Sequence, residues 1–195
     1  MAAQALLAGV LYLSTATSTH IHRPLPPSSH STWSATPEPM GSTNPLQVEL
    51  SAGSVNSSVT CTIRNSDPKH AITFLTWDTP FDPTAINSGV LTIKDADTSA
   101  EVPSPEMKIN RQMPPPRDAL QEVAPMLSVK REMNLSSPWI PTDGKKYQVS
   151  VEGKWRAAWK KPAAQITDEE LAAVKGDGDL QGDFGSESVE MELGE

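Results

Sequence analysis

Two aspartates, Asp78 and Asp82, lie four residues apart in a segment that prolines interrupt, and Arg117 follows a run of three further prolines. Loop carboxylates at such spacing can bind Ca²⁺, which takes roughly six to eight oxygen ligands. Beside an arginine they could instead form an acid–base site in an enzyme. A structural role competes with both, because aspartate commonly supplies the hydrogen bonds of turns, and we favour that role.

Few side chains are available for other site chemistry. Between residues 46 and 159 the sequence has a single cysteine, Cys61, and a single histidine, His70. A zinc site needs roughly three or four ligands, and a nucleophilic enzyme would have to use His70, in a predicted turn, as its base. We therefore expect no catalytic residue, no metal site and no cofactor. We expect Cys61 to be a buried structural thiol.

Tryptophan is the remaining residue type that suggests binding. Trp155 and Trp159 are four residues apart, so on one strand they would share a side. We favour core packing for most of the tryptophans, whereas an exposed pair would indicate a carbohydrate or protein contact. The candidate loop or surface contacts are accordingly Trp77, Asp78, Asp82, Arg117, Trp155 and Trp159.

Alternating apolar and polar residues predict the strands that must position these side chains. The pattern predicts strands over 46–51, 55–64, 71–77, 90–94, 107–111, 126–135 and 146–151, with an eighth near 155–159. Turn residues separate these segments, and no helical period competes with them. We therefore predict an all-β fold, an immunoglobulin-like antiparallel β-sandwich of seven or eight strands over residues 46–162.

The two ends of the chain differ in composition from the predicted sandwich. Residues 20–45 are rich in Pro, Ser and Thr, which predicts a disordered linker. Residues 163–176 predict a short helix, because Thr167 and Glu170 have the spacing of a capping box. Between 163 and 195 there are ten acidic residues and one basic residue, in a chain of net charge −8. This predicts an acidic, disordered tail over 177–195, and the absence of a basic stripe argues against nucleic-acid binding.

The first nineteen residues bear on the compartment. An apolar run at 5–13 followed by a small-x-small pattern resembles a secretory signal, although no basic residue precedes it. The run is too short to span a bilayer, so we expect no integral membrane segment. A single unpaired cysteine favours a reducing compartment. We therefore favour a cytoplasmic protein, with secretion as the alternative if residues 5–16 act as a signal; the sequons at Asn56 and Asn134 matter only in that case.

Two segments carry a family resemblance. The sequences TCTIRN at 60–65 and FLTWDTPFD at 74–82 resemble the Ig-like module that precedes the catalytic domain in fungal deuterolysin and lysine-specific zinc endopeptidases. The forms around Trp77 and MPPPR at 113–117 are more similar still to uncharacterised stand-alone fungal proteins of this sandwich type. The resemblance covers about residues 46–159 and implies the fold. It does not imply protease activity, because the zinc-binding segment is absent from this sequence.

Three functions remain open at this point. The first is a non-catalytic binding or interaction module, with a protein partner, that acts through its loops or an exposed sheet edge. The second is a secreted accessory of proteolysis, such as an inhibitor or a prodomain-like chaperone. The third is an enzyme with a site around Asp78, Asp82 and Arg117. The sequence favours the first and leaves the partner and the oligomeric state open.

Overall fold

The structure is a computed structural model that describes residues 44–105 and 107–194. The signal-like segment at 1–19 and nearly all of the predicted linker at 20–45 lie outside the described residues. The described strands are β1 (Leu46–Ala52), β2 (Ser58–Asn65), β3 (Ile72–Leu75), β4 (Leu91–Asp95), β5 (Leu120–Val123), β6 (Ser128–Asn134), β7 (Lys145–Trp155), β8 (Ala158–Trp159), β9 (Gly182–Gly185) and β10 (Val189–Leu193). The helices are α1 (Asp168–Ala173) and the 3₁₀ turns η1 (Ala85–Asn87), η2 (Arg117–Ala119), η3 (Ala163–Gln165) and η4 (Gly178–Leu180).

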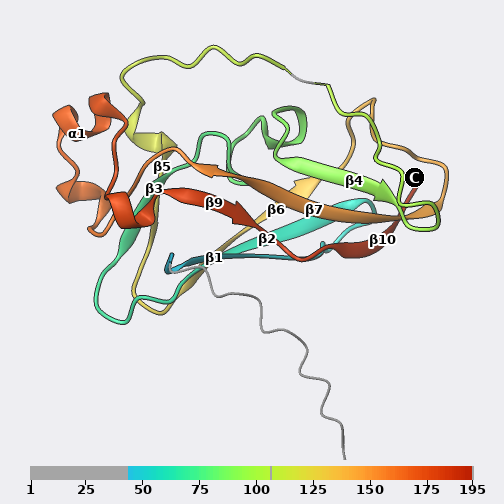
Figure 1. Ribbon diagram of the computed structural model, residues 1–195, viewed down its shortest axis with the longest axis horizontal. Helices are drawn as coiled ribbons and strands as arrows, with labels where there is room; N and C mark the ends of the chain where they lie inside the picture. Colours follow the sequence, from blue (N-terminus) through green and yellow to red (C-terminus); the bar gives the residue numbers. More distant parts are fainter. Residues whose placement is uncertain (1–43, 106, 195) are drawn as a thin grey trace, which may run out of the picture. The chain divides into compact units, whose positions relative to one another are not determined.

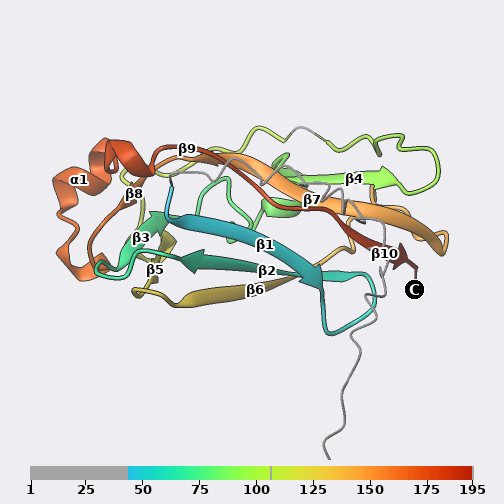
Figure 2. The ribbon, with the colours of Figure 1, turned by 60° about the horizontal axis from the view of Figure 1, so that its bottom comes forward.

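The strands form three antiparallel sheets (Figure 1). One sheet has the order β1-β2-β6, the second has the order β10-β7-β4 with β9 also paired to β7, and the third has the order β5-β3-β8. The first two sheets lie face to face as the layers of a sandwich, with β1 beside β9 and β10 at one margin (Figure 2). The all-β sandwich predicted from the sequence is confirmed.

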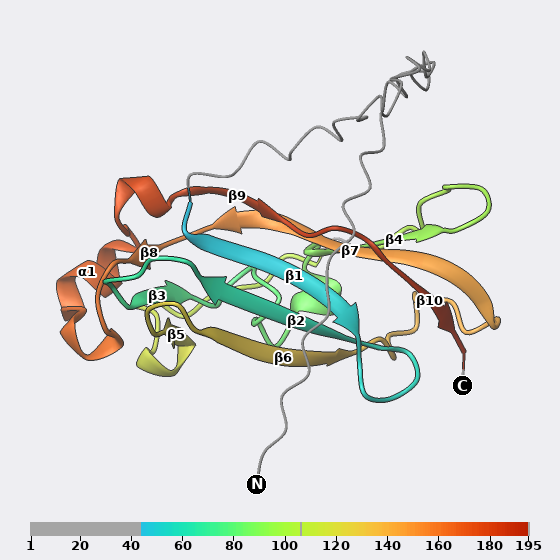
Figure 3. The same cartoon turned by 90° about the horizontal axis from the view of Figure 1, so that it is seen from below.

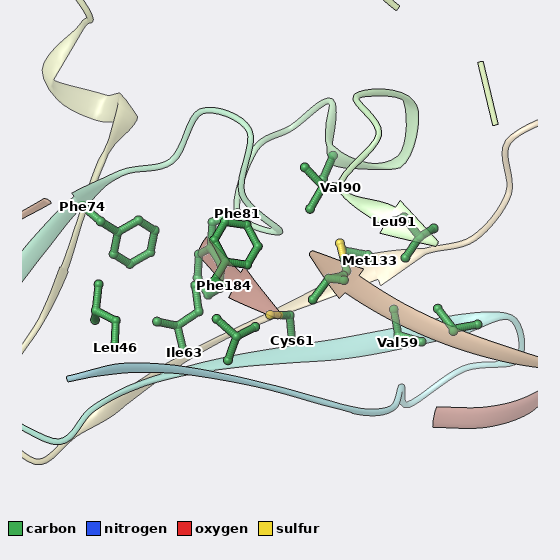
Figure 4. Packing of buried hydrophobic residues seen from close by; sticks show 14 of the residues in the cluster. Leu46, Val59, Cys61, Ile63, Phe74, Phe81, Val90, Leu91, Met133 and Phe184 are labelled. Atoms are coloured by element: carbon green, nitrogen blue, oxygen red, sulfur yellow. The ribbon is translucent and has the colours of Figure 1, made fainter. Parts of the chain in front are cut away.

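The core lies between these layers. Along β2 the apolar residues alternate inward, so Val59, Cys61 and Ile63 are all fully buried (Figure 4). Burial raises the pKa of the Cys61 thiol to about 12. The thiol is therefore protonated near neutral pH, and Cys61 acts as a small apolar side chain, as predicted.

One predicted strand is wrong. Residues 107–111 form no strand, and Met107 is largely exposed. Prolines flank this segment at 103, 105 and 114–116, and proline cannot donate a ladder hydrogen bond. The fifth strand along the chain is instead β5, a four-residue strand that the sequence pattern did not indicate.

The predicted disordered tail is also wrong. After η4 the chain returns to the sheet as β9 and β10, which both pair with β7. Along β10 the acidic residues Glu190 and Glu192 are exposed, whereas Leu193 is fully buried. The alternation of a half-buried strand was present in VEMEL, but the acidic composition concealed it. The sandwich predicted to end at residue 162 therefore continues to residue 193.

The predicted helix is present and its N-terminus is capped as expected. The Thr167 hydroxyl accepts a hydrogen bond from the Glu170 amide, and the Glu170 carboxylate accepts one from the Thr167 amide. The helix ends at Val174, which has a left-handed conformation. Gly176 lies two residues beyond Val174. A Cβ atom at this position would lie 2.0 Å from the Ala158 carbonyl oxygen, so glycine is needed because the two backbone segments come close together and not because it ends the helix.

A surface carboxylate fixes the turn between β1 and β2. The Glu132 side chain on β6 accepts hydrogen bonds from the Ser58 hydroxyl and from both the hydroxyl and the amide of Ser54. These donors stabilise the charged form, so the pKa of Glu132 falls from 4.5 to about 2. The turn at 53–57 is thereby tied to the middle strand and to the edge strand of its sheet.

Loss of the aromatic anchor of β9 should destabilise the whole sandwich. Phe184 is buried with its ring centroid 4.8 Å from that of Trp155. We expect Phe184→Ala to lower the free energy of unfolding by about 3–5 kcal/mol. Glu187→Ala, at an exposed position between β9 and β10, should change it by less than about 0.5 kcal/mol. If urea denaturation showed an equally small change in the free energy of unfolding for both variants, the packing described for the C-terminal strands would be contradicted.

The Glu132 contacts predict a pH dependence. Because the folded pKa of about 2 lies below the ordinary 4.5, this group stabilises the fold above pH 4.5, and that contribution is lost as the pH falls towards 2. We expect the Glu132→Gln variant to show a flatter decline of Tm over this range than the unmodified protein. NMR titration should give the Glu132 carboxyl a pKa well below 4.5, and Ser54→Ala should raise that pKa. A pKa near 4.5 in the unmodified protein would disprove these contacts.

Candidate functional site

The centre of the candidate site is a buried carboxylate in the loop after β3. The Asp82 side chain is fully buried. It accepts hydrogen bonds from the Asp78 amide at 2.8 Å and from the amide and hydroxyl of Thr84 at 2.9 and 2.7 Å. Asp78 has a positive φ of 56°, a conformation that aspartate tolerates better than most residues. Asp82 therefore folds its own loop into a compact turn.

Two arginines neutralise the pair of aspartates. The Arg111 guanidinium donates to both Asp78 and Asp82, with 3.0 Å between its Nη2 and Asp78 Oδ1. Arg156 Nε donates to the other oxygen of Asp78. The Arg111 guanidinium also lies over the ring of Trp77, 5.4 Å from the ring centroid, which is the geometry of a cation–π contact.

The electrostatics favour the charged form of Asp82. Burial by itself raises the pKa of this carboxyl, but the hydrogen bonds from Thr84, from the Asp78 amide and from Arg111 outweigh it, and the pKa lies below the ordinary 3.8. A carboxylate held ionised and saturated with donors is a poor proton donor near neutral pH. The arrangement is therefore suited to holding a loop in place.

The structure brings together only some of the residues singled out from the sequence. Trp77, Asp78 and Asp82 do share one cluster, as their spacing suggested. Arg117 is not part of it, because its guanidinium pairs with Asp168 at the start of α1. Sequence reasoning missed Arg111, which fills the role expected of Arg117. Its only signal was its position in the proline-rich segment, which Arg117 shares.

The tryptophan pair does not form a surface. Trp155 and Trp159 are 4% and 1% exposed, so neither presents a ring face to a ligand. Trp155 ends β7 and packs on Phe74 and Phe184, whereas Trp159 lies in β8 and donates to the Lys175 carbonyl. The carbohydrate contact considered for an exposed pair is thus ruled out for these two rings.

An open cavity adjoins the aspartate–arginine cluster. Its volume is about 350 Å³. The cluster contributes Trp77, Asp82 and Arg111 to its lining, and the other lining residues are Thr76, Phe81, Pro83, Thr84, Pro116, Asp118, Ala119, Leu120, Gln121 and Arg131. The cavity therefore combines an apolar wall with charges of both signs, and it includes side chains from β5 and β6.

Both of those strands lie at sheet margins (Figure 3). Among the described strands, β5 pairs only with β3, and β6 pairs only with β2. Along β6, Lys130 and Glu132 are exposed, whereas Arg131 points inward and donates to the Phe81 carbonyl. The free backbone edge of β6 thus runs past the cavity.

The described part of the chain contains neither a metal-ligand cluster nor a membrane-spanning helix. No three His, Cys, Asp or Glu side chains gather there in a group that could hold a metal ion. No helix among residues 44–105 and 107–194 is long and apolar enough to cross a membrane.

Removal of the central charge tests the role of the cluster. Asp82→Asn should lower the free energy of unfolding by about 3 kcal/mol, because the mostly buried Arg111 loses a charged partner. Glu190→Gln is the matched control: it breaks an exposed ion pair with Lys146 and should cost less than about 1 kcal/mol. Chemical denaturation of both variants measures the difference. Equal stabilities would mean that the buried pair does not hold the loop.

Two comparisons with known proteins bear on identity. An "Uncharacterized secreted protein" of the fungus Arthroderma benhamiae is 35% identical over 133 residues. The match spans 67% of this chain and 66% of that protein, just under two thirds of its length. The name of this relative contradicts the cytoplasmic location favoured from the sequence. Cys61 explains the error, because a lone buried thiol has no partner to form a disulfide with and so says little about the compartment.

The second comparison concerns the fold family. A family model described as an immunoglobulin-like domain matches residues 45–193. This range includes β9 and β10, which composition had assigned to a tail. The finer resemblance to the module of fungal zinc endopeptidases stays a prediction. Given the match over most of its length and the antiparallel sandwich described above, the chain belongs to the immunoglobulin-like domain family.

Proposed function

We propose that this protein is an exported, non-catalytic binding module whose free β5–β6 margin and adjoining cavity take an extended segment of a protein partner. The observation that carries the proposal is the meeting of two edges, unpaired among the described strands, with a cavity of about 350 Å³ at one place. An unpaired edge offers backbone donors and acceptors to an added strand, and a neighbouring pocket selects its side chains.

The charges on β6 fit specific recognition. Edge strands with exposed charges resist indiscriminate pairing with other strands. Lys130 and Glu132 supply such charges on the solvent side. A partner strand must therefore be compatible with Lys130, since Glu132 already accepts hydrogen bonds from Ser54 and Ser58. An apolar side chain of that strand would enter the cavity between Trp77 and Leu120.

The cluster beneath the cavity supports a binding role over a catalytic one. Asp78, Asp82 and Arg111 are all engaged with one another, so none of them stands free to transfer a proton. A network of this kind keeps the wall of the cavity in one conformation. A preorganised site loses less conformational entropy when a partner binds.

Export is supported by the secreted relative in Arthroderma benhamiae and by the signal-like residues 5–16 of this sequence. The same support applies to the second candidate, an accessory of proteolysis, which requires export. That candidate differs only in the identity of the partner, since an inhibitor or chaperone would place the β6 edge against a protease. Loss of protease activity on addition of the purified protein would favour it.

Selection of peptides tests the binding mode. A random peptide library displayed on phage, panned against the purified full chain, should yield extended sequences with an apolar residue. NMR spectra of the complex should show shifts in the amides of β5 and β6 and in the indole of Trp77. Gln121→Trp, which fills the cavity from β5, should weaken binding at least tenfold, whereas Thr142→Trp at an exposed site elsewhere should not.

Melting curves of both variants must match that of the unmodified protein for the comparison to hold. Peptides whose shifts map instead to β1, at the other margin of the same sheet, would overturn the proposed site. Failure to select any peptide above background would overturn the binding mode itself.

A further inference from the structure

Two asparagines in Asn-x-Ser sequons lie at the same end of the sandwich. Asn56 is in the turn between β1 and β2, and Asn134 is the last residue of β6. The strand register places Ser58 opposite Asn134, so the two sequons lie on neighbouring strands. Figure 2 shows this turn at the end of the described fold that also holds the end of β10, with α1 at the other end.

Both asparagines are accessible in the folded protein. Each is exposed, and among the described residues neither side-chain amide makes a hydrogen bond. Asn65 shows the opposite situation, because its amide is fully buried and donates to the carbonyls of His70 and Val123. Ser136, the hydroxyl residue of the second sequon, is exposed as well.

The same two asparagines border one shallow hollow of about 460 Å³. Its apolar part comes from Leu135, Pro138 and Ile140. This hollow shares no lining residue with the cavity beside Trp77. Leu135 and Ile140 are already buried, whereas Pro138 is exposed. A bulky polar group attached here would therefore leave the core undisturbed and the proposed partner site open.

We propose that Asn134 and Asn56 carry N-linked glycans that cover this end of the sandwich, an inference that rests on the proposed export. The donor is a lipid-linked oligosaccharide diphosphate. The bond between the anomeric carbon and the diphosphate oxygen breaks, and a bond forms between that carbon and the asparagine Nδ2. The amide proton is lost, the lipid diphosphate leaves, and nothing is oxidised or reduced.

The position of Asn134 gives the modification a consequence for binding. A glycan on the last residue of β6 blocks the free edge from being extended past that point. An added strand must therefore pair with residues 128–133, next to Arg131 and the cavity. The two sugars would also prevent a second sandwich from stacking edge to edge at this end.

Expression of the full chain in a eukaryotic host tests the sites separately from export. The chain is produced once with its own N-terminus and once behind an added signal peptide that forces entry into the secretory pathway. Intact masses are measured before and after treatment with peptide-N-glycosidase F. We expect two removable glycans, of which Asn134→Gln and Ser136→Ala each remove the same one and Asn56→Gln removes the other.

Asn110→Gln is the control, since Asn110 is exposed but Gln112 stands where a sequon has Ser or Thr. It should leave both glycans in place. A protein secreted with the added signal but free of glycan would overturn the proposed sites and leave export untouched. Glycans on the protein with the added signal, together with retention of the native chain in the cell, would support the sites and overturn the proposed export.

Discussion

The buried carboxylate of Asp82 is the constraint on which the functional side of this sandwich depends. A charge cannot be buried cheaply without partners. Asp82 obtains them from its own loop and from Arg111, which is 29 residues further along the chain. The proline-rich segment that carries Arg111 must therefore run beside the loop after β3, although it forms no strand there. This contact fixes the wall of the cavity. The margins of β5 and β6 next to it have no strand neighbour among the described residues.

Strand alternation predicted most of the fold because each half-buried strand must send one set of side chains to the core. This rule located β1, β2, β4 and β7 within a few residues. It failed where composition or proline competed with it. The residues of β10 alternate as in other edge strands, but their acidic side chains led to the prediction of a disordered tail. The strand β5 has only four residues, too few to show a period of two. Both errors concern elements whose place is decided by long-range pairing.

The candidate site was only half predictable for a related reason. Trp77, Asp78 and Asp82 are neighbours in sequence, so their proximity followed from the turn itself. Arg111 reaches Asp78 across 33 residues of irregular chain, and no local pattern distinguishes it from Arg117. Core packing was the favoured role of the tryptophans and both are buried, but they share no strand face, because the chain bends after Trp155 and Trp159 belongs to another strand. Side chains four apart share a face only while one strand continues.

The polar groups are distributed differently over the two ends of the sandwich, and this difference makes the margin near Arg131 suitable for binding an added strand. At the end that holds the two sequons, the Glu132 carboxylate accepts three hydrogen bonds from Ser54 and Ser58 and so fixes the β1–β2 turn. Asn134, two residues further along β6, is exposed. That end is closed by local contacts. Next to the cavity, by contrast, the rigid ion pair lies behind the surface and the free backbone lies at it. Rigidity beneath an unpaired edge is the combination that strand addition requires, because the added strand must find its hydrogen-bonding groups already in register.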